Sequence, residues 1–221
     1  MILFNSGPIL NKYDYAVKRY EEKPIEKGKI LFYGACTFTR WKEKYGNGDL
    51  EDAILNKDGT KACINHGFGS ATAETLLYFY DRLVRPWEPK VLVLKNGGND
   101  PTSGYSPIDS FFLLSRIINY ARVDMPGIQF YLSGVHGNYV TKADIVLWRD
   151  EYNELLKDYS EKHDDCTYVN YTDSPLFFDN PEDVGNPNKL KPSFFLDGRH
   201  FNAEGYKASG QFWTEVLDKY L

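Results

Sequence analysis

The sequence predicts an α/β protein, a three-layer α/β/α sandwich built on a five-stranded parallel sheet. Short apolar runs alternate along the chain with longer segments whose apolar residues recur at helical spacing, which is typical of parallel βαβ units. Three of these runs are also followed by glycine-bearing turns. Because parallel strands end at the same edge of the sheet, we expect the three turns to lie together on one rim. Ligands bind at this edge, outside the carboxyl ends of the strands.

The strands are expected where β-branched, leucine or aromatic residues form short runs that end in turn residues. Five segments meet this description: residues 29–33, 62–65, 91–94, 130–135 and 167–170. The third run is the clearest, because Val91 to Leu94 is bounded by the turn Asn96-Gly97-Gly98-Asn99-Asp100.

Helical periodicity connects these strands. It is found in residues 76–84, 107–123 and 143–163, and Asn202 is placed to cap a last helix running toward Tyr220. The polar stretch from Tyr171 to Ser193, rich in Pro and Asn, predicts a long loop or lid that folds over the site. Residues 1–28 are expected to be an N-terminal arm, extended or with a short helix, ahead of a single domain at 29–221.

Composition excludes several classes of protein. A net charge of −5 over 221 residues, with no basic stretch, argues against a nucleic-acid-binding surface. No apolar run approaches the roughly 18 residues of a membrane span. The N-terminus has no signal-peptide pattern, and three cysteines form no disulfide framework, so a cytoplasmic location is expected. The sequence indicates no oligomeric state.

Four turn segments carry candidate chemistry. Acyl transfer needs a nucleophile, a base and a group that orients the base. Asp197 and His200, three residues apart, can supply the last two, and Cys36 lies at the end of the first strand. Each segment alone is a weak signal, and their conjunction carries the prediction. The segments are Gly34-Ala35-Cys36, Asn65-His66-Gly67-Phe68-Gly69-Ser70, Gly97-Gly98-Asn99-Asp100 and Asp197-Gly198-Arg199-His200.

From about residue 29 to the C-terminus, these four segments resemble, in order, the conserved blocks of the SGNH/GDSL hydrolase family. The resemblance implies a flavodoxin-like sandwich and an esterase or acylhydrolase that needs no cofactor or metal. It implies a Cys36–His200–Asp197 triad. It also implies an oxyanion hole formed by the backbone N–H of Cys36, the backbone N–H of Ser70 or its neighbour Gly69, and the Asn99 side chain.

Further residues are expected to contact a small-molecule acyl ester. These are Ala35, Thr37, His136 and Arg199. His136 follows the fourth strand, and a surface position is its alternative. Short acyl groups on carbohydrate or lipid-derived alcohols are the expected substrates, since no long apolar tunnel is apparent in the sequence.

The first block departs from the family pattern, which reads Gly-Asp-Ser. Here Ala35 and Cys36 take the last two places, and Ser70 stands where the second block has glycine. A cysteine paired with histidine is a workable nucleophile, because its thiol ionises far more readily than a hydroxyl. The alternative is a catalytically impaired protein of the same fold that binds an acylated or glycan ligand.

Two other readings of the sequence remain open. Gly67-x-Gly69-x-x-Thr72 resembles part of a dinucleotide fingerprint, although it lacks the last glycine. Cys63-x-x-His66 could form half of a metal site, but the sequence offers no second pair.

Overall fold

The structure, a computed structural model, describes residues 6–137 and 142–221. Its centre is one sheet of five parallel strands in the order β2-β1-β3-β4-β5, the order of flavodoxin-like folds. The predicted fold class is therefore confirmed. The strands are β1 (Ile30–Gly34), β2 (Cys63–Gly67), β3 (Val91–Lys95), β4 (Gln129–Ser133) and β5 (Cys166–Val169).

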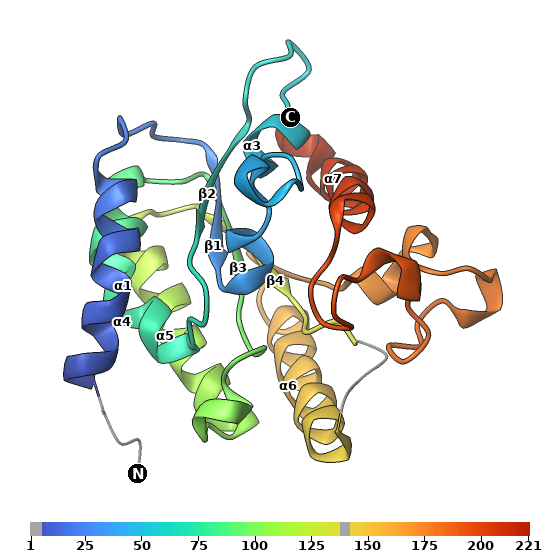
Figure 1. The fold of residues 1–221 in the computed structure, drawn as a ribbon. Helices are drawn as coiled ribbons and strands as arrows, with labels where there is room; N and C mark the ends of the chain where they lie inside the picture. The colour runs from blue at the N-terminus through green and yellow to red at the C-terminus, as the bar shows by residue number, and fades with distance from the viewer. Residues whose placement is uncertain (1–5, 138–141) are drawn as a thin grey trace.

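Helices cover both faces of the sheet (Figure 1). The first face is covered by α1, α4, α5 and α6, and the second by α2, α3, α7 and the irregular segment 171–195. The helices are α1 (Ser6–Glu21), α2 (Cys36–Thr39), α3 (Leu50–Ala53), α4 (Ala73–Leu83), α5 (Pro107–Asp124), α6 (Ala143–Glu161) and α7 (Ala203–Leu217). Among the described residues, no helix is both long and apolar enough to cross a membrane.

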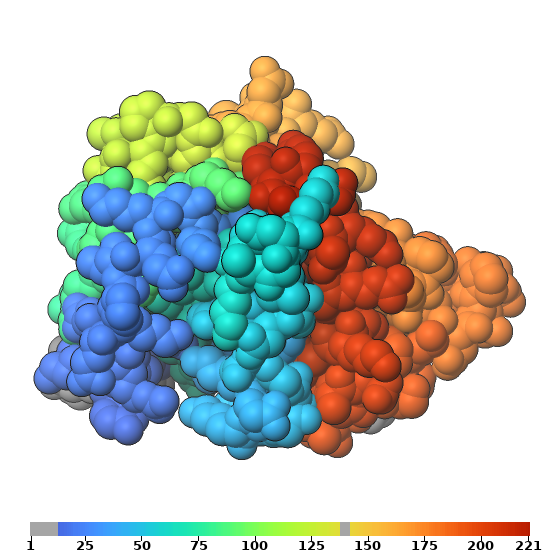
Figure 2. All heavy atoms as spheres, turned by 90° about the horizontal axis from the view of Figure 1, so that it is seen from above, coloured from blue at the N-terminus to red at the C-terminus, as the bar shows by residue number. Residues whose placement is uncertain are grey.

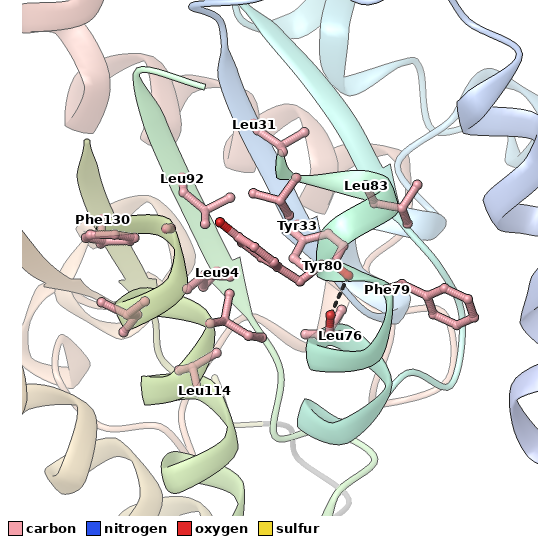
Figure 3. Packing of buried hydrophobic residues seen from close by; sticks show 14 of the residues in the cluster. Leu31, Tyr33, Leu76, Phe79, Tyr80, Leu83, Leu92, Leu94, Leu114 and Phe130 are labelled. Atoms are coloured by element: carbon pink, nitrogen blue, oxygen red, sulfur yellow. Dashed lines mark hydrogen bonds between the residues drawn. The ribbon is translucent and has the colours of Figure 1, made fainter. Parts of the chain in front are cut away.

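The strands separate the two cores by alternation, because successive side chains of a strand point to opposite faces. Leu31 and Tyr33 pack on the first face, and Ile30 and Phe32 on the second. Figure 3 shows the first core, where Tyr33 lies between the sheet and α4. The buried Tyr33 hydroxyl donates to the Leu76 carbonyl at 2.7 Å, so this polar atom is satisfied within the core.

Of the two alternatives expected for the N-terminal segment, the structure shows the helix, which packs on the domain and is not a separate arm. The segment forms the 16-residue helix α1, whose Tyr13, Val17 and Tyr20 are at most 5% exposed and belong to the first core. Their spacing of four and three residues places them on one helical face, which packs on α4. In Figure 2, residues 40–65 (cyan) lie between this helix (blue) and α7 (red) at the surface shown.

The segment predicted to be a lid is anchored in the second core near both of its ends, while residues 179–189 between them are largely exposed. It contains four short 3₁₀ turns, and its Phe177, Phe178 and Leu190 are buried in the second core. Hydrophobic contact, which a polar composition does not reveal, therefore holds this segment in place.

The fourth strand ends earlier than predicted. It stops at Ser133, and Val135 lies beyond it. There the Asn153 side chain of α6 accepts a hydrogen bond from the Val135 amide at 2.8 Å and donates one to its carbonyl at 2.9 Å. The side-chain amide thus replaces the strand ladder and turns the chain toward the rim.

Candidate active site

Cys36 begins α2, two residues after β1 ends at Gly34. The turn needs glycine at position 34, because a Cβ atom there would lie 2.3 Å from the Lys95 carbonyl oxygen. The Ala35 amide donates to that same oxygen at 3.2 Å. The close approach of β1 and β3 therefore fixes the half-buried Cys36 at the carboxyl edge of the sheet.

Two hydrogen-bond donors from neighbouring loops face the Cys36 sulfur. The Ser70 amide lies 3.4 Å from Sγ and the Asn99 side-chain nitrogen lies 3.8 Å from it. Asn99 also donates to the Ala71 carbonyl at 3.0 Å, which joins the loops after β2 and β3. The amide that points at Cys36 is that of Ser70, while Gly69 lines a separate hollow beside α1.

Ser70 adopts a left-handed backbone conformation with φ of 61°. Non-glycine residues visit this region infrequently, so neighbouring contacts must hold it. One comes from α1, where the Tyr13 hydroxyl donates to the Ser70 carbonyl at 2.7 Å. The Tyr20 hydroxyl donates to the Gly67 carbonyl at the start of the same loop.

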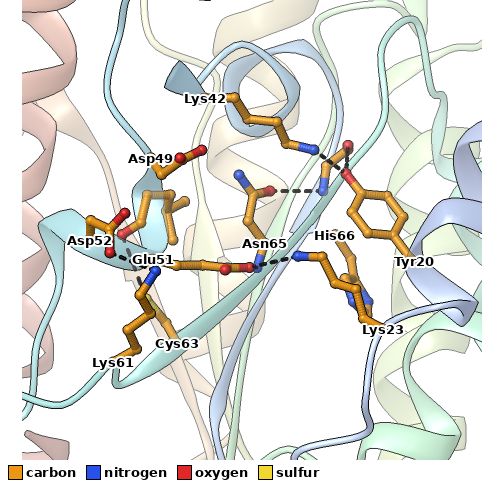
Figure 4. A network of polar contacts seen from close by, with 12 residues as sticks. Tyr20, Lys23, Lys42, Asp49, Glu51, Asp52, Lys61, Cys63, Asn65 and His66 are labelled. Atoms are coloured by element: carbon orange, nitrogen blue, oxygen red, sulfur yellow. Dashed lines mark hydrogen bonds and ion pairs between the residues drawn. The ribbon is translucent and has the colours of Figure 1, made fainter. Parts of the chain in front are cut away.

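A network of polar contacts holds the end of β2, where the loop that carries Ser70 begins (Figure 4). Lys42 donates to the Tyr20 hydroxyl at 2.7 Å, and the Gly67 amide donates to the Asn65 side chain at 2.9 Å. The Glu51 carboxylate accepts from the Asn65 amide at 3.0 Å. The end of β2 is thereby fixed by partners on α1, α3 and the chain that follows α2.

The loop after β3 is organised by Asp100, which is fully buried. Its carboxylate accepts hydrogen bonds from the Gly97 and Ala73 amides, each at 2.9 Å. The first amide of α4 thus already donates to the Asp100 carboxyl group, at the place where a dinucleotide fold would bind its pyrophosphate. This geometry contradicts the dinucleotide reading.

His200 and Asp197 approach from the opposite side of the rim. Nδ1 of His200 lies 2.8 Å from one Asp197 oxygen, and the other oxygen accepts from the His200 amide at 2.8 Å. A Phe195–Phe201 bridge closes the turn. The Tyr206 hydroxyl of α7 donates to the Thr37 carbonyl at 2.8 Å, which ties this half of the site to the Cys36 turn.

The charges of these groups depend on one another. Burial raises the pKa of the Cys36 thiol, but hydrogen bonds with His200, the Ser70 amide and Asn99 lower it to about 7. The hydrogen bond with Cys36 raises the pKa of His200. Burial lowers this pKa, and the hydrogen bond with Asp197 raises it further. Burial raises the pKa of Asp197, but its hydrogen bonds to His200 and Arg199 lower it to about 2. The arrangement thus favours a thiolate beside an imidazolium and a carboxylate.

A cavity of about 90 Å³ opens beside Cys36. The residues predicted from sequence to touch substrate all line it: Ala35, Thr37, His136 and Arg199. His136 is half-buried, and its ring stacks on that of Phe201 with 4.9 Å between the ring centres. Arg199 is exposed at the mouth of the cavity.

Sequence reasoning missed the other end of this cavity, which is lined by Lys95, Trp148 and Arg149. The Lys95 ammonium donates to the Gly134 carbonyl at 2.5 Å, and burial lowers its pKa to about 7. Arg149 is 2% exposed although it lies within an amphipathic helix. A lysine that ends an otherwise apolar strand was the available signal for Lys95.

The remaining cysteines and histidines do not converge on the site. Cys63 lies in the second core with its sulfur near the Leu50 and Ile54 carbonyls. His66, on the opposite face of β2, contacts the Leu83 carbonyl through Nδ1 at 2.8 Å. The two side chains therefore cannot share a metal, and no cluster of three such ligands occurs within residues 6–137 and 142–221. Cys166 is also buried.

The fold and the rim define an α/β/α domain with a cysteine, a histidine and an aspartate at the carboxyl edge of its sheet. Residues 36–208 match the model of the GDSL-like lipase/acylhydrolase family, and the chain belongs to that family. It is 30% identical over 151 residues to a multidomain esterase of Ruminococcus flavefaciens. That match covers 62% of this chain and only 17% of the esterase.

Solved structures share the fold at low identity. A GDSL-like lipase from Bacteroides thetaiotaomicron superposes with a TM-score of 0.70 at 16% identity, over 96% of this chain and 100% of the other. A member of the lipolytic G-D-S-L family from Veillonella parvula superposes with a TM-score of 0.66 at 19% identity, over 86% of this chain and 98% of the other.

Proposed function

We propose that this protein hydrolyses carboxylic esters or thioesters of small acyl groups with Cys36 as nucleophile, His200 as general base and acid, and Asp197 as the group that orients His200. The observation that carries the proposal is the environment of the Cys36 sulfur. Two hydrogen-bond donors lie 3.4 and 3.8 Å from it, and a histidine held by a carboxylate at 2.8 Å lowers its pKa.

In the first half of the reaction, the Cys36 thiolate attacks the carbonyl carbon of the ester. The carbonyl electron pair moves onto oxygen, and the amides of Cys36 and Ser70 together with the Asn99 side chain stabilise that charge. When the intermediate collapses, the His200 imidazolium gives its proton to the departing alcohol oxygen. An acyl thioester on Cys36 remains.

In the second half, His200 takes a proton from a water molecule as the water attacks the thioester carbonyl. The same donors hold the second oxyanion. The carbon–sulfur bond then breaks, the carboxylic acid leaves, and the thiolate and imidazolium are restored. Asp197 keeps Nδ1 of His200 as the protonated nitrogen throughout, which leaves Nε2 for catalysis.

The proposed substrates carry short acyl groups on carbohydrate or lipid-derived alcohols. The cavity beside Cys36 is small, with a volume of about 90 Å³, which favours a short acyl group over a long one. A reducing compartment, the cytoplasm, fits a low-pKa thiol, because oxidation would inactivate it.

The test is hydrolysis of p-nitrophenyl acetate and of a short acyl thioester by the unchanged protein and by Cys36→Ala and His200→Ala. Activity that both substitutions abolish supports the proposal. If the unchanged protein matches the buffer blank with both substrates, the proposal is wrong, and a ligand-binding role for the cavity takes its place. Cys36→Ser then shows whether the surrounding donors can still support an oxygen nucleophile.

A further inference from the structure

The part of the cavity that α6 lines carries a buried cation. The Arg149 guanidinium projects from α6 with a side chain 3% exposed, and Arg149 lines the cavity together with Cys36 and His200. A buried guanidinium is costly unless every part of it is paired. Its pairing is therefore informative about what the cavity holds.

The guanidinium is only partly paired. Its Nε donates to Asp150 at 2.8 Å, and its Nη1 lies 3.4 Å from the Asn188 side-chain oxygen, which is a weak contact. Nη2 is buried and has no hydrogen-bond partner within residues 6–137 and 142–221. Asp150 is half exposed, so water weakens its neutralisation of Arg149.

None of the described residues that line the cavity is an aspartate or a glutamate. His136 and Lys95 line the same wall, and Nδ1 of His136 is likewise buried without a partner in the described part of the chain. Arg199 stands at the mouth. Among the described residues that line the cavity, Arg149 is thus a buried cation with an unpaired nitrogen, which favours an acceptor-rich anionic group beside it.

We propose that the ester substrate carries a carboxylate, and that Arg149 binds this carboxylate at the α6 end of the cavity while the ester carbonyl lies at Cys36. The proposal rests on the proposed ester hydrolysis and names its substrate class. The unpaired Nη2 and the weakly held Nη1 form one edge of the guanidinium, and a planar carboxylate can accept two parallel N–H bonds from such an edge. His136 and Arg199 are placed to contact the same substrate.

The test compares esters that differ only in charge. The monomethyl esters of succinate, glutarate and adipate are paired with their neutral ω-carboxamides, and kcat/KM is measured for each. We expect the carboxylate to be preferred by about tenfold or more in at least one pair, the size typical of a charge-assisted hydrogen bond. In Arg149→Met, the ratio of kcat/KM for the carboxylate to kcat/KM for the amide should fall to near one in that pair. In Arg149→Lys, this ratio should fall less.

Arg116→Met is the matched control, because it removes one positive charge from an exposed position on α5, away from the cavity. Its ratio should equal that of the unchanged protein. Equal rates for acid and amide in every pair would overturn the proposal, as would a preference that survives in a folded Arg149→Met. Thermal melting establishes folding, and Arg149→Lys decides the matter if Arg149→Met does not fold.

A second measurement does not depend on turnover. Glutarate should slow the alkylation of Cys36 by iodoacetamide in the unchanged protein, and glutaramide should not. If glutarate does not protect Cys36 from alkylation, the proposed carboxylate site does not exist. If inorganic phosphate protects Cys36 as well as glutarate does, the site does not select a carboxylate. Protection without hydrolysis of any ester would instead disprove the proposed function and leave the anion site standing.

Discussion

The Tyr13 hydroxyl donates a hydrogen bond to the Ser70 carbonyl at 2.7 Å, across 57 residues of sequence. It connects the first helix to the residue whose amide faces the Cys36 sulfur. Because Ser70 has a left-handed backbone, the orientation of its amide depends on contacts of this kind. The helix α1 therefore contributes to the geometry of the site without touching the nucleophile.

Removal of this hydroxyl tests that contribution. Tyr13→Phe should lower the free energy of unfolding by about 1 kcal/mol, the usual net value of one hydrogen bond, and should lower kcat more than it raises KM. Denaturant unfolding and esterase kinetics measure the two effects. Tyr15→Phe is the matched control, since Tyr15 is 74% exposed two residues away. Equal kinetics in both variants would show that the contact does not position the loop.

Alkylation should single out Cys36 among the three cysteines. Only the thiolate reacts, and with a pKa of about 7 its rate should reach half of its maximum near pH 7 as the pH rises. Burial raises the pKa of Cys166 to about 12 and that of Cys63 higher still, so both should stay slow. Mass spectrometry of iodoacetamide-treated protein from pH 5 to 10 measures each rate.

His200→Ala is the control for that profile. It removes the largest of the interactions that lower the pKa of Cys36, so the midpoint should move to higher pH. A midpoint that stays in place in His200→Ala would mean that the imidazole does not activate the thiol.

The Asp197 carboxylate should affect catalysis through its contact with His200. Asp197→Asn keeps the size of the side chain but no longer favours protonation at Nδ1, so we expect kcat/KM to fall by about a hundredfold or more. The pKa of His200 should also fall, because Asp197 is one of the groups that raise it. NMR titration of the imidazole checks this second effect, and Glu204→Gln, at an exposed position of α7, is the control.

The left-handed backbone of Ser70 should limit which side chains are tolerated at this position. A β-branched residue is strained at a φ of 61°, so Ser70→Val should destabilise the protein by about 1–2 kcal/mol. Ser70→Gly should change stability by less than about 1 kcal/mol, because lost strain and gained chain entropy oppose each other. Thermal unfolding of the two variants is the measurement, and similar values for both would argue against the left-handed conformation.

The sheet and the four rim segments could be predicted because their signals are local. A glycine turn after an apolar run, as at Gly34 and Gly97, marks a strand end, and Asp197 lies close in sequence to His200. The amide of Ser70 was predicted only to within one residue, since a backbone donor leaves no mark in the side-chain pattern.

The residues that were missed act across the fold. The partners of Tyr13 and Tyr20 lie 57 and 47 residues away, so their helix resembled a separable arm. Arg149 occupies an inward position of α6 that the pattern would assign to an apolar residue. Buried charges break the alternation on which sequence prediction rests, and they concentrate where function requires them.

The hydrogen bond from Tyr206 to the Thr37 carbonyl joins two parts of the site that the chain builds separately. The sulfur and its donors follow three adjacent strands, so a substitution that displaces one displaces the others. His200 belongs to a segment outside the sheet, anchored by aromatic packing of Phe195 and Phe201. Insertions or exchanges before Phe195 can therefore alter which molecules reach the histidine while the rest of the machinery is inherited intact.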